Sequence, residues 1–369
     1  MKKQIIISNY DDLKNPYYGG GGAVSIHNVA RYLAKTDKVT VITGKYPGSK
    51  KTTIDGVNYI RAGAFVIGPR VSQLLFQLCL PIKVITMKHD VWIESFTPPF
   101  STAFTPLFTK KPVIGLVHLL GGEDKARQYK LPFYIIERIG LKFYRNFIIQ
   151  TKSTERKILK YSPKARIAMI PNGLEPHYLN RKVSKEGSFA LFLGRLEVNQ
   201  KGLDLLVQAF LKMKKEDRFI VKIAGSGSKK QTNELKNKIK KSGLEDTFEL
   251  VGRVEGKAKE RLLEKAAFML MPSRYETFPL TAMEAFAFGN AVVCFDIDGF
   301  KWLPKSLSVK IKPFKVESYS KASVSLMRDT KKRNEIEKSA IKYARSFDWK
   351  KITIEYSKYI NSVIKDEKK

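Results

Sequence analysis

The sequence predicts an α/β protein with two doubly wound parallel sheets. Short apolar runs of the kind found in buried strands alternate with segments whose apolar residues recur at helical spacing. This alternation is typical of parallel sheets that carry helices on both faces. The series recurs after a polar break near Lys182–Gly187, and 369 residues are enough for two domains of ordinary size.

The first domain begins with a strand, a glycine cluster and a helix. Ile5–Ile7 is an apolar run, Gly19–Gly22 follows it, and Ile26, Val29 and Leu33 then recur at helical spacing. Further strands are expected at Val39–Thr43, Val113–Val117 and Ile167–Ile170. Val71–Leu80 is either an amphipathic helix at a membrane or a core helix, which is the preferred interpretation.

The second domain repeats this order. Its expected strands are Phe189–Leu193, Phe219–Ala224, Thr247–Val251, Phe268–Met271 and Ala291–Phe295. Its expected helices are Leu203–Met213, Lys229–Lys241 and one that begins near Leu280. The chain then ends in an amphipathic helix over Ser346–Lys369.

The composition excludes several classes of protein. Two cysteines, Cys79 and Cys294, exclude a disulfide-stapled scaffold, and the four histidines form no cluster at zinc spacing. The first residues, MKKQIIISNYDD, are too short for a signal-peptide core. The uncharged stretch Ser95–Thr109 holds three prolines and is too short to span a bilayer. We therefore expect a cytoplasmic protein, with a peripheral position on the inner face of the membrane left open.

The net charge of +33 has three interpretations: binding to nucleic acid, binding to an anionic membrane, or a lysine-rich genome. The basic excess is +18 through Lys182 (29 basic, 11 acidic) and +15 afterwards (39 basic, 24 acidic), so no separate basic tail carries it. No helix-turn-helix or RNP signature supports nucleic acid, which we therefore rank last.

Glycines and cations mark the ends of predicted strands. Gly19–Gly22 lies between a strand and a helix, where the backbone can approach a phosphate closely, although a flexible turn has the same composition. Arg195 follows a strand end at Gly194, and Lys201 precedes Gly202 at the start of a helix. Because ligands bind at the carboxyl ends of parallel strands, these two cations suit a diphosphate, although either alone is typical of a protein surface.

The segment Pro272–Gly289 carries two carboxylates eight residues apart, Glu276 and Glu284. Glu276 is expected in a loop, where it can accept hydrogen bonds from sugar hydroxyls, and Glu284 inside the helix can accept from a ribose. The backbone N–H groups of Thr277, Phe278 and Leu280 face the start of that helix, a good position for an anion, whereas Pro279 has none. Helix capping and salt bridges would explain both carboxylates equally well.

Two further strand ends carry polar residues. His118 follows Val113–Val117 and precedes Gly121 and Gly122, so it is either a ligand contact or a satisfied rim residue. Asn172 lies in the turn after Ile167–Ile170. Gly225-Ser226-Gly227 lacks the third glycine of a dinucleotide fingerprint, and the chain contains no P-loop motif.

These residues together resemble the retaining, nucleotide-sugar-dependent glycosyltransferases of family 4. The matches run in order along nearly the whole chain: the glycine loop, His118, IPNGLE at Ile170–Glu175, GRL with Lys201-Gly202, AGSG at Ala224–Gly227, Glu276 to Glu284, and FDWKKI at Phe347–Ile352.

The resemblance implies the GT-B fold, in which two Rossmann-like domains face each other across a cleft. The acceptor-binding domain would be residues 1–183 and the donor-binding domain 184–346, with 347–369 crossing back as a helix. It implies an enzyme that uses a nucleotide sugar as donor, needs no metal or other cofactor, and acts on a saccharide or lipid-linked acceptor for the cell envelope.

The resemblance also assigns roles. Arg195 and Lys201 would hold the leaving diphosphate, Glu284 the ribose, Glu276 the transferred sugar, and His118 would meet that sugar from the other domain. The remaining donor-site residues would be Gly20, Gly21, Gly22, Asn172, Gly194, Gly225, Arg253, Thr277, Phe278, Pro279 and Leu280.

The chain departs from the family pattern at several positions. Thr277 and Pro279 stand where the family often has glycines, Asn290 replaces a common proline, and Phe295–Leu303 lacks the usual glycine pair followed by proline and glutamate. Two alternatives remain: a nucleotide-sugar epimerase of the same architecture, which would need more cleft histidines, and a degenerate GT-B protein whose basic surface binds membrane or nucleic acid.

Overall fold

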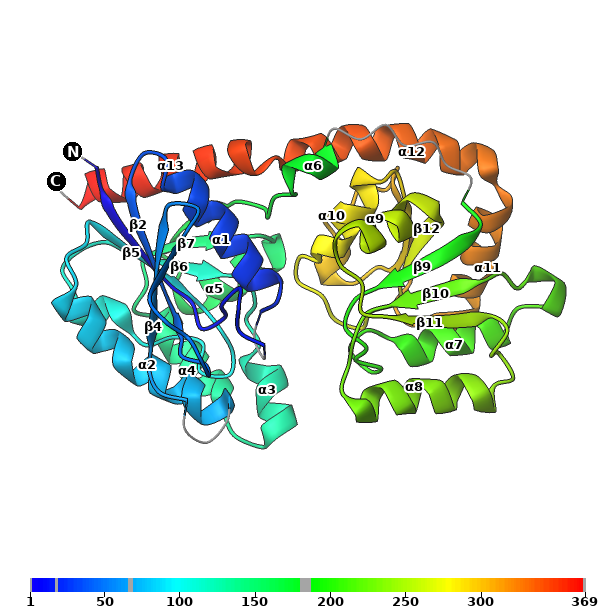
Figure 1. Cartoon of the computed structure of the whole chain (residues 1–369), viewed down its shortest axis with the longest axis horizontal. Helices are drawn as coiled ribbons and strands as arrows, with labels where there is room; N and C mark the ends of the chain where they lie inside the picture. Colours follow the sequence, from blue (N-terminus) through cyan, green and yellow to red (C-terminus); the bar gives the residue numbers. More distant parts are fainter. Residues whose placement is uncertain (1, 17–18, 66–68, 180–186, 368–369) are drawn as a thin grey trace. The chain divides into compact units, whose positions relative to one another are not determined.

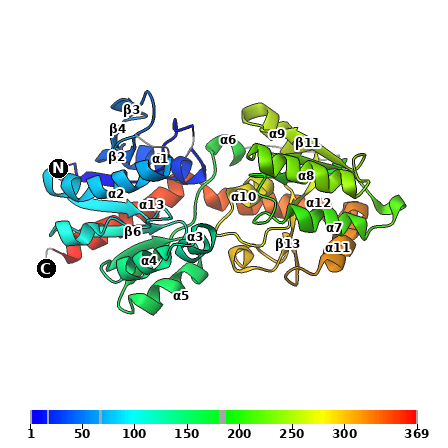
Figure 2. The ribbon, with the colours of Figure 1, turned by 90° about the horizontal axis from the view of Figure 1, so that it is seen from below.

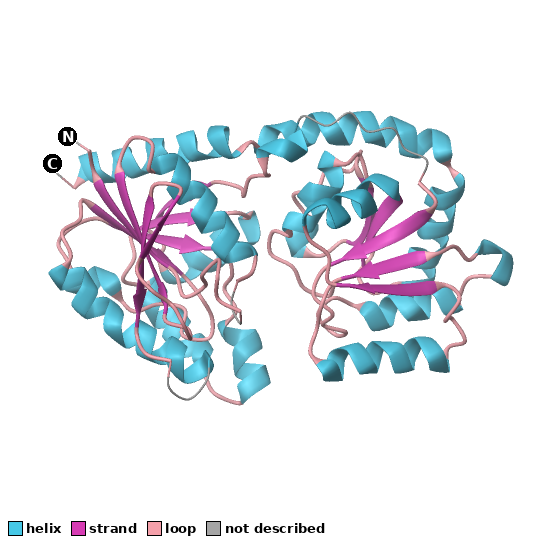
Figure 3. Cartoon of the chain, in the orientation of Figure 1, coloured by secondary structure: helices cyan, strands magenta, loops and turns pink. Residues whose placement is uncertain are grey.

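The computed structural model describes residues 2–16, 19–65, 69–179 and 187–367. The chain forms two compact units: an N-terminal unit of Met1–Gly173 with Trp349–Lys369, and a C-terminal unit of Leu174–Asp348. Each unit is a largely parallel sheet covered by helices, so the predicted α/β class is confirmed (Figure 3). The predicted boundary at residues 183 and 184 lies outside the described residues.

The N-terminal unit has an eight-stranded sheet in the order β3-β4-β2-β1-β5-β6-β7-β8. All neighbours are parallel except β3 and β4. The strands are β1 (Gln4–Ser8), β2 (Lys38–Gly44), β3 (Thr52–Ile54), β4 (Val57–Ala62), β5 (Val91–Ser95), β6 (Val113–Val117), β7 (Asn146–Ile149) and β8 (Arg166–Met169).

Helices cover both faces of this sheet because its strands are apolar on both sides. Ile5 and Ile7 of β1 pack with α1 (Gly21–Leu33) and α13 (Trp349–Asp366), while Ile6 between them packs with helices on the other face. Those helices are α2 (Pro69–Thr86), α4 (Phe133–Leu141) and α5 (Lys152–Tyr161) (Figures 1 and 2). The 3₁₀ turn η1 (Thr105–Phe108) and α3 (Gly122–Tyr129) complete the unit.

The inner face of α2 agrees with the sequence prediction, whereas the start of the last helix differs from it. The α2 helix contains Val71–Leu80 and buries Phe76, Leu80 and Val84, so the core-helix interpretation is confirmed for its inner face. The last helix begins later than expected, at Trp349, because η4 (Arg345–Phe347) forms a 3₁₀ turn and Asp348 is extended.

The C-terminal unit has a six-stranded parallel sheet in the order β11-β10-β9-β12-β13-β14. Its strands are β9 (Phe189–Leu193), β10 (Val221–Ala224), β11 (Phe248–Gly252), β12 (Ala266–Met271), β13 (Ala291–Phe295) and β14 (Ser308–Ile311). Its helices are α6 (Pro176–Leu179), α7 (Leu203–Leu211), α8 (Lys229–Lys241), α9 (Gly256–Lys265), α10 (Leu280–Ala287), α11 (Val316–Arg328) and α12 (Thr330–Ala344), with 3₁₀ turns η2 (Lys215–Asp217) and η3 (Asp298–Phe300).

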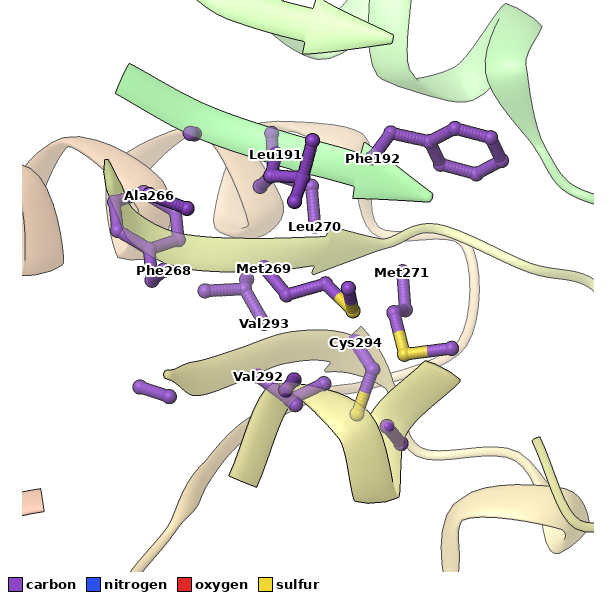
Figure 4. Close-up of a cluster of buried hydrophobic side chains, with 14 of the residues drawn as sticks. Leu191, Phe192, Ala266, Phe268, Met269, Leu270, Met271, Val292, Val293 and Cys294 are labelled. Carbon is purple, nitrogen blue, oxygen red and sulfur yellow. The ribbon is translucent and has the colours of Figure 1, made fainter. Parts of the chain in front are cut away.

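Apolar side chains of β9, β12 and β13 form the centre of this unit, as Figure 4 shows. The chain builds the sheet outward from β9 to β11 and then returns to β12 on the other side of β9. The crevice between the carboxyl ends of β9 and β12 is therefore a topological switch point, the place where open α/β sheets bind ligands.

Candidate functional site

Two predicted site residues meet at the switch point of the C-terminal unit. Lys201, just before α7, donates from Nζ to Oε1 of Glu276, in the loop between β12 and α10, over 2.6 Å. Their side chains are only 14% and 8% exposed, and Ser273 Oγ donates to the same carboxylate oxygen over 2.8 Å. This partly buried ion pair is fixed in place by its neighbours.

A second ion pair holds the loop that carries Glu276. Arg274 donates from both terminal nitrogens to the two carboxylate oxygens of Asp204 in α7, each over 2.7 Å. Its backbone N–H donates to the carbonyl of Gln200 over 2.9 Å. Planar bidentate pairs are geometrically specific, so the loop is tied to the start of α7.

Three glycines let the backbone segments around this pair approach closely. A Cβ on Gly225, whose φ is +150°, would lie 1.7 Å from the carbonyl oxygen of Gly194. A Cβ on Gly202 would lie 2.0 Å from the Pro272 oxygen, and one on Gly299 would lie 2.1 Å from the Glu276 oxygen. The strand ends therefore form a narrow floor with little side-chain bulk.

The two predicted arginines differ from Lys201 in being exposed. Arg195 donates to Glu197 over 2.9 Å, with its side chain 65% exposed. Arg253 follows β11 and pairs with Glu255, and both side chains are 72% exposed. Such exposed pairs contribute little to stability, so both guanidinium groups can turn toward an anion.

Glu284 has a partner that sequence reasoning missed. Lys259 of α9 donates from Nζ to Glu284 Oε1 over 2.8 Å and lies 5.4 Å from the ring centre of Tyr178. Burial lowers the pKa of Lys259, but the Glu284 carboxylate and the Tyr178 hydroxyl together outweigh burial and raise this pKa above its usual value. Lys259 is therefore charged at neutral pH and holds the carboxylate of Glu284.

The segment Thr277–Leu280 is only partly as expected. Pro279 is the N-cap of α10, and Leu280 begins the helix as predicted. The Phe278 side chain is 7% exposed and stacks on Trp302 with ring centres 4.2 Å apart, so it belongs to the core. Only the backbone of Phe278 remains available to contact a ligand. Asn290, in place of a common proline, is fully buried and donates to the Leu263 carbonyl over 2.8 Å.

The N-terminal unit holds the remaining predicted residues. His118 follows β6, and its Nε2 is buried without a hydrogen-bond partner among the described residues. Burial lowers the pKa of His118 to about 4, so the imidazole is neutral at pH 7. Gly20 is the N-cap of α1, with Gly21 and Gly22 in its first turn. Asn172 accepts a hydrogen bond from Ser25 Oγ of α1 over 2.6 Å.

The described part of the chain has neither a cluster of metal ligands nor a membrane-spanning helix. Among these residues, no group of three or more His, Cys, Asp and Glu side chains is placed to hold a metal ion. No helix in the same part combines the length and apolar character that crossing a bilayer requires.

Two family models match this chain in succession. Residues 19–178 match the model described as Glycosyltransferase Family 4, and residues 180–343 match Glycosyl transferases group 1. The two matches together span both units.

Curated relatives match parts of the chain. A mannosylfructose-phosphate synthase of Agrobacterium fabrum is 31% identical over 46% of this chain and 43% of its own length. A GDP-mannose:cellobiosyl-diphosphopolyprenol alpha-mannosyltransferase of Xanthomonas oryzae is 23% identical over 62% of this chain and 61% of its own length. The chain thus spans less than two thirds of either relative.

Solved structures match the chain along almost its full length. The sucrose-phosphate synthase of Thermosynechococcus elongatus superposes with a TM-score of 0.81 at 16% identity, covering 99% of this chain and 100% of that one. HepE of Anabaena, solved in complex with UDP, gives a TM-score of 0.72 at 15% identity, covering 98% and 100%. At such low identity these similarities show the fold alone.

Proposed function

Because the chain belongs to the family 4 glycosyltransferases and has the GT-B fold, we propose that it transfers a sugar from a nucleoside-diphosphate sugar, with retention and without a metal ion. The observation that carries this proposal is the Lys201–Glu276 pair at the switch point of the C-terminal unit. A fixed cation and a fixed carboxylate lie side by side where α/β sheets bind ligands.

Lys201 and Arg195 would stabilise the leaving group. Transfer breaks the bond between the anomeric carbon and the diphosphate oxygen, so negative charge develops on the diphosphate. Lys201 is held in place by Glu276, whereas exposed Arg195 is free to leave Glu197 for the stronger anion. The acceptor hydroxyl would attack on the face that the leaving group departs from, and a diphosphate oxygen would take its proton.

The other predicted residues would bind the rest of the donor. Glu276 would accept hydrogen bonds from hydroxyls of the transferred sugar, and Glu284 from the ribose. Gly194 and Gly225 approach each other closely and carry no side chains, so they leave space for the nucleotide. His118, neutral and with an unpartnered Nε2 among the described residues, would bind a sugar hydroxyl without adding charge.

The names of similar proteins support the proposed substrate classes. A curated relative is named for GDP-mannose and a diphosphopolyprenol acceptor, and HepE was solved with UDP. UDP- and GDP-sugars are therefore the first donors to test, and a saccharide or a lipid-linked saccharide of the cell envelope is the proposed acceptor. We propose that the enzyme acts in the cytoplasm and that it uses nucleotide sugars there as donors.

The test is release of nucleoside diphosphate from UDP- and GDP-sugars in EDTA, with saccharide and lipid-extract acceptors. We expect release from one donor class by the native chain, and less than one hundredth of that rate from Arg195→Ala/Lys201→Ala. Lys222→Ala is the matched control and should keep full activity, because Lys222 of β10 pairs with Glu249 of β11 and is not one of the predicted site residues. Release that the double variant retains would overturn the proposed site, and release only with added metal would overturn metal independence.

A further inference from the structure

The α2 helix exposes large apolar side chains on its outer face, in addition to the apolar side chains that its inner face packs into the core. Gln73 and Gln77 are buried, and Gln73 donates to the carbonyls of Thr97 and Pro98. Leu78, Ile82 and Ile85 point outward and are 62%, 62% and 66% exposed. Their spacing of four and three residues aligns them along one stripe of the helix. A contiguous stripe of large exposed apolar side chains marks a site that contacts another protein or a membrane.

The apolar stripe continues onto neighbouring elements. The η1 turn packs against α2 and exposes Leu107 and Phe108. Phe104, just before η1, contacts the ring of Phe143, which follows α4 on the same face of the sheet (Figure 1). Of the 18 large hydrophobic residues exposed in the described chain, 11 belong to this set: Val71, Leu74, Leu78, Ile82, Ile85, Leu107, Phe108, Leu131, Ile135, Ile139 and Phe143. We call these residues the apolar face.

Lysines lie beside the apolar face, and acids are rare there. No acidic residue occurs between Asp55 and Asp90, and none between the fully buried Glu94 and Glu123. Lys88 follows α2, and Lys110 and Lys111 follow η1. These three lysines, with Lys2 and Lys3, line a hollow of about 460 Å³ that also includes Asp90 and Glu367.

We propose that the apolar face docks on a bilayer of anionic phospholipid. Its Leu, Ile and Phe side chains would enter the boundary between headgroups and acyl chains, while Lys88, Lys110 and Lys111 would meet lipid phosphates. A second copy of this chain is a poor occupant, because lysines would face lysines across the interface in a chain of net charge +33. The proposal does not depend on the donor site.

Native Cys79 provides a reporter of insertion. It lies next to Leu78 and is partly exposed, whereas the other cysteine, Cys294, is fully buried and burial raises its pKa to about 12. A thiol-reactive environment-sensitive fluorophore therefore labels α2 selectively in the full chain. We expect brighter, blue-shifted emission with vesicles of 30% phosphatidylglycerol in phosphatidylcholine, and co-flotation of the unlabelled chain with the same vesicles.

The variant Leu78→Ser/Ile82→Ser/Ile85→Ser should bind these vesicles at least tenfold more weakly, with its melting temperature and nucleotide affinity unchanged. The matched control, Leu211→Ser/Ile220→Ser/Phe314→Ser, removes three side chains of the C-terminal unit that are 45%, 42% and 46% exposed, and should bind like the native chain. Equal binding by both triple variants would mean adsorption by charge alone and would overturn the proposal. A dimer that only the α2 variant dissociates, with no vesicle binding, would assign the face to protein contact and also overturn it.

Discussion

Lys201 and Glu276, 75 residues apart in sequence, form a 2.6 Å ion pair that joins the start of α7 to the loop after β12. The two opposite charges balance, so each partner holds the other in position. An incoming diphosphate would share the Lys201 ammonium, and this would leave Glu276 available for sugar hydroxyls.

Removing either member of this pair should reduce activity more than donor binding. Lys201→Ala should lower kcat/KM by about 10²–10³, the usual effect of losing one fixed group that stabilises transition-state charge. Glu276→Gln, which keeps the shape but loses the charge, should show a similar loss. Steady-state kinetics with the preferred donor measures both. A loss of less than threefold in each variant would contradict their assignment.

Lys259 should act by positioning Glu284. Lys259→Met leaves the Glu284 carboxylate without its 2.8 Å partner, so the ribose contact should weaken. We expect donor KM to rise about tenfold, a loss of about 1.4 kcal/mol in binding, with kcat within threefold of the native value. Lys257→Met, an exposed position on the same helix, is the control. Equal KM values in the two variants would rule out the positioning role.

The stability of the chain should fall in mild acid because of His118. Burial lowers the pKa of His118 to about 4 in the folded chain, against about 6.5 when unfolded, so the unfolded state binds more protons. The contribution of His118 is present above pH 6.5 and is lost as the pH falls toward 4. Between pH 7 and pH 5 it should amount to about 2 kcal/mol in the free energy of unfolding.

Urea unfolding at the two pH values measures this contribution, and His118→Gln provides the comparison. The variant should lose about 2 kcal/mol less than the native chain between pH 7 and pH 5. The same pH dependence in both proteins would show that His118 titrates normally.

Gly225→Ala should prevent the close approach of two strand ends. Both this site and Gly243 have positive φ, but only a Cβ on Gly225 meets backbone, 1.7 Å from the Gly194 oxygen. Gly243→Ala, in open space, should cost about 1 kcal/mol of stability. Gly225→Ala should cost at least about 3 kcal/mol and weaken nucleotide binding. Thermal melts of both variants make the comparison, and equal costs would refute the close approach.

The positions of several strands could be predicted from the sequence because buried parallel strands are continuous apolar runs. Phe189–Leu193 matches β9 residue for residue, and the start of α10 at Leu280 follows from Pro279 before it. The Lys201–Glu276 juxtaposition follows from topology, since both residues come after neighbouring strands of a parallel sheet.

Other features of the site left no local signal. Lys259 lies in a polar helix among other lysines, and only the tertiary fold shows that it faces Glu284. Phe278 lies in the middle of the predicted anion loop, yet stacking on Trp302 places its side chain in the core. Gly299 belongs to a segment that departs from the family pattern, but its backbone packs against that of Glu276. Each of these contacts joins residues distant in sequence.

The most direct test of the donor site is calorimetric titration of the native chain with UDP, GDP, ADP and CMP in EDTA, beside the Arg195→Ala/Lys201→Ala variant. Our account predicts that the native chain binds one of these nucleotides and that the variant binds it at least a hundredfold more weakly. Binding by neither protein, or equal binding by both, would contradict the assignment of the diphosphate site to Arg195 and Lys201.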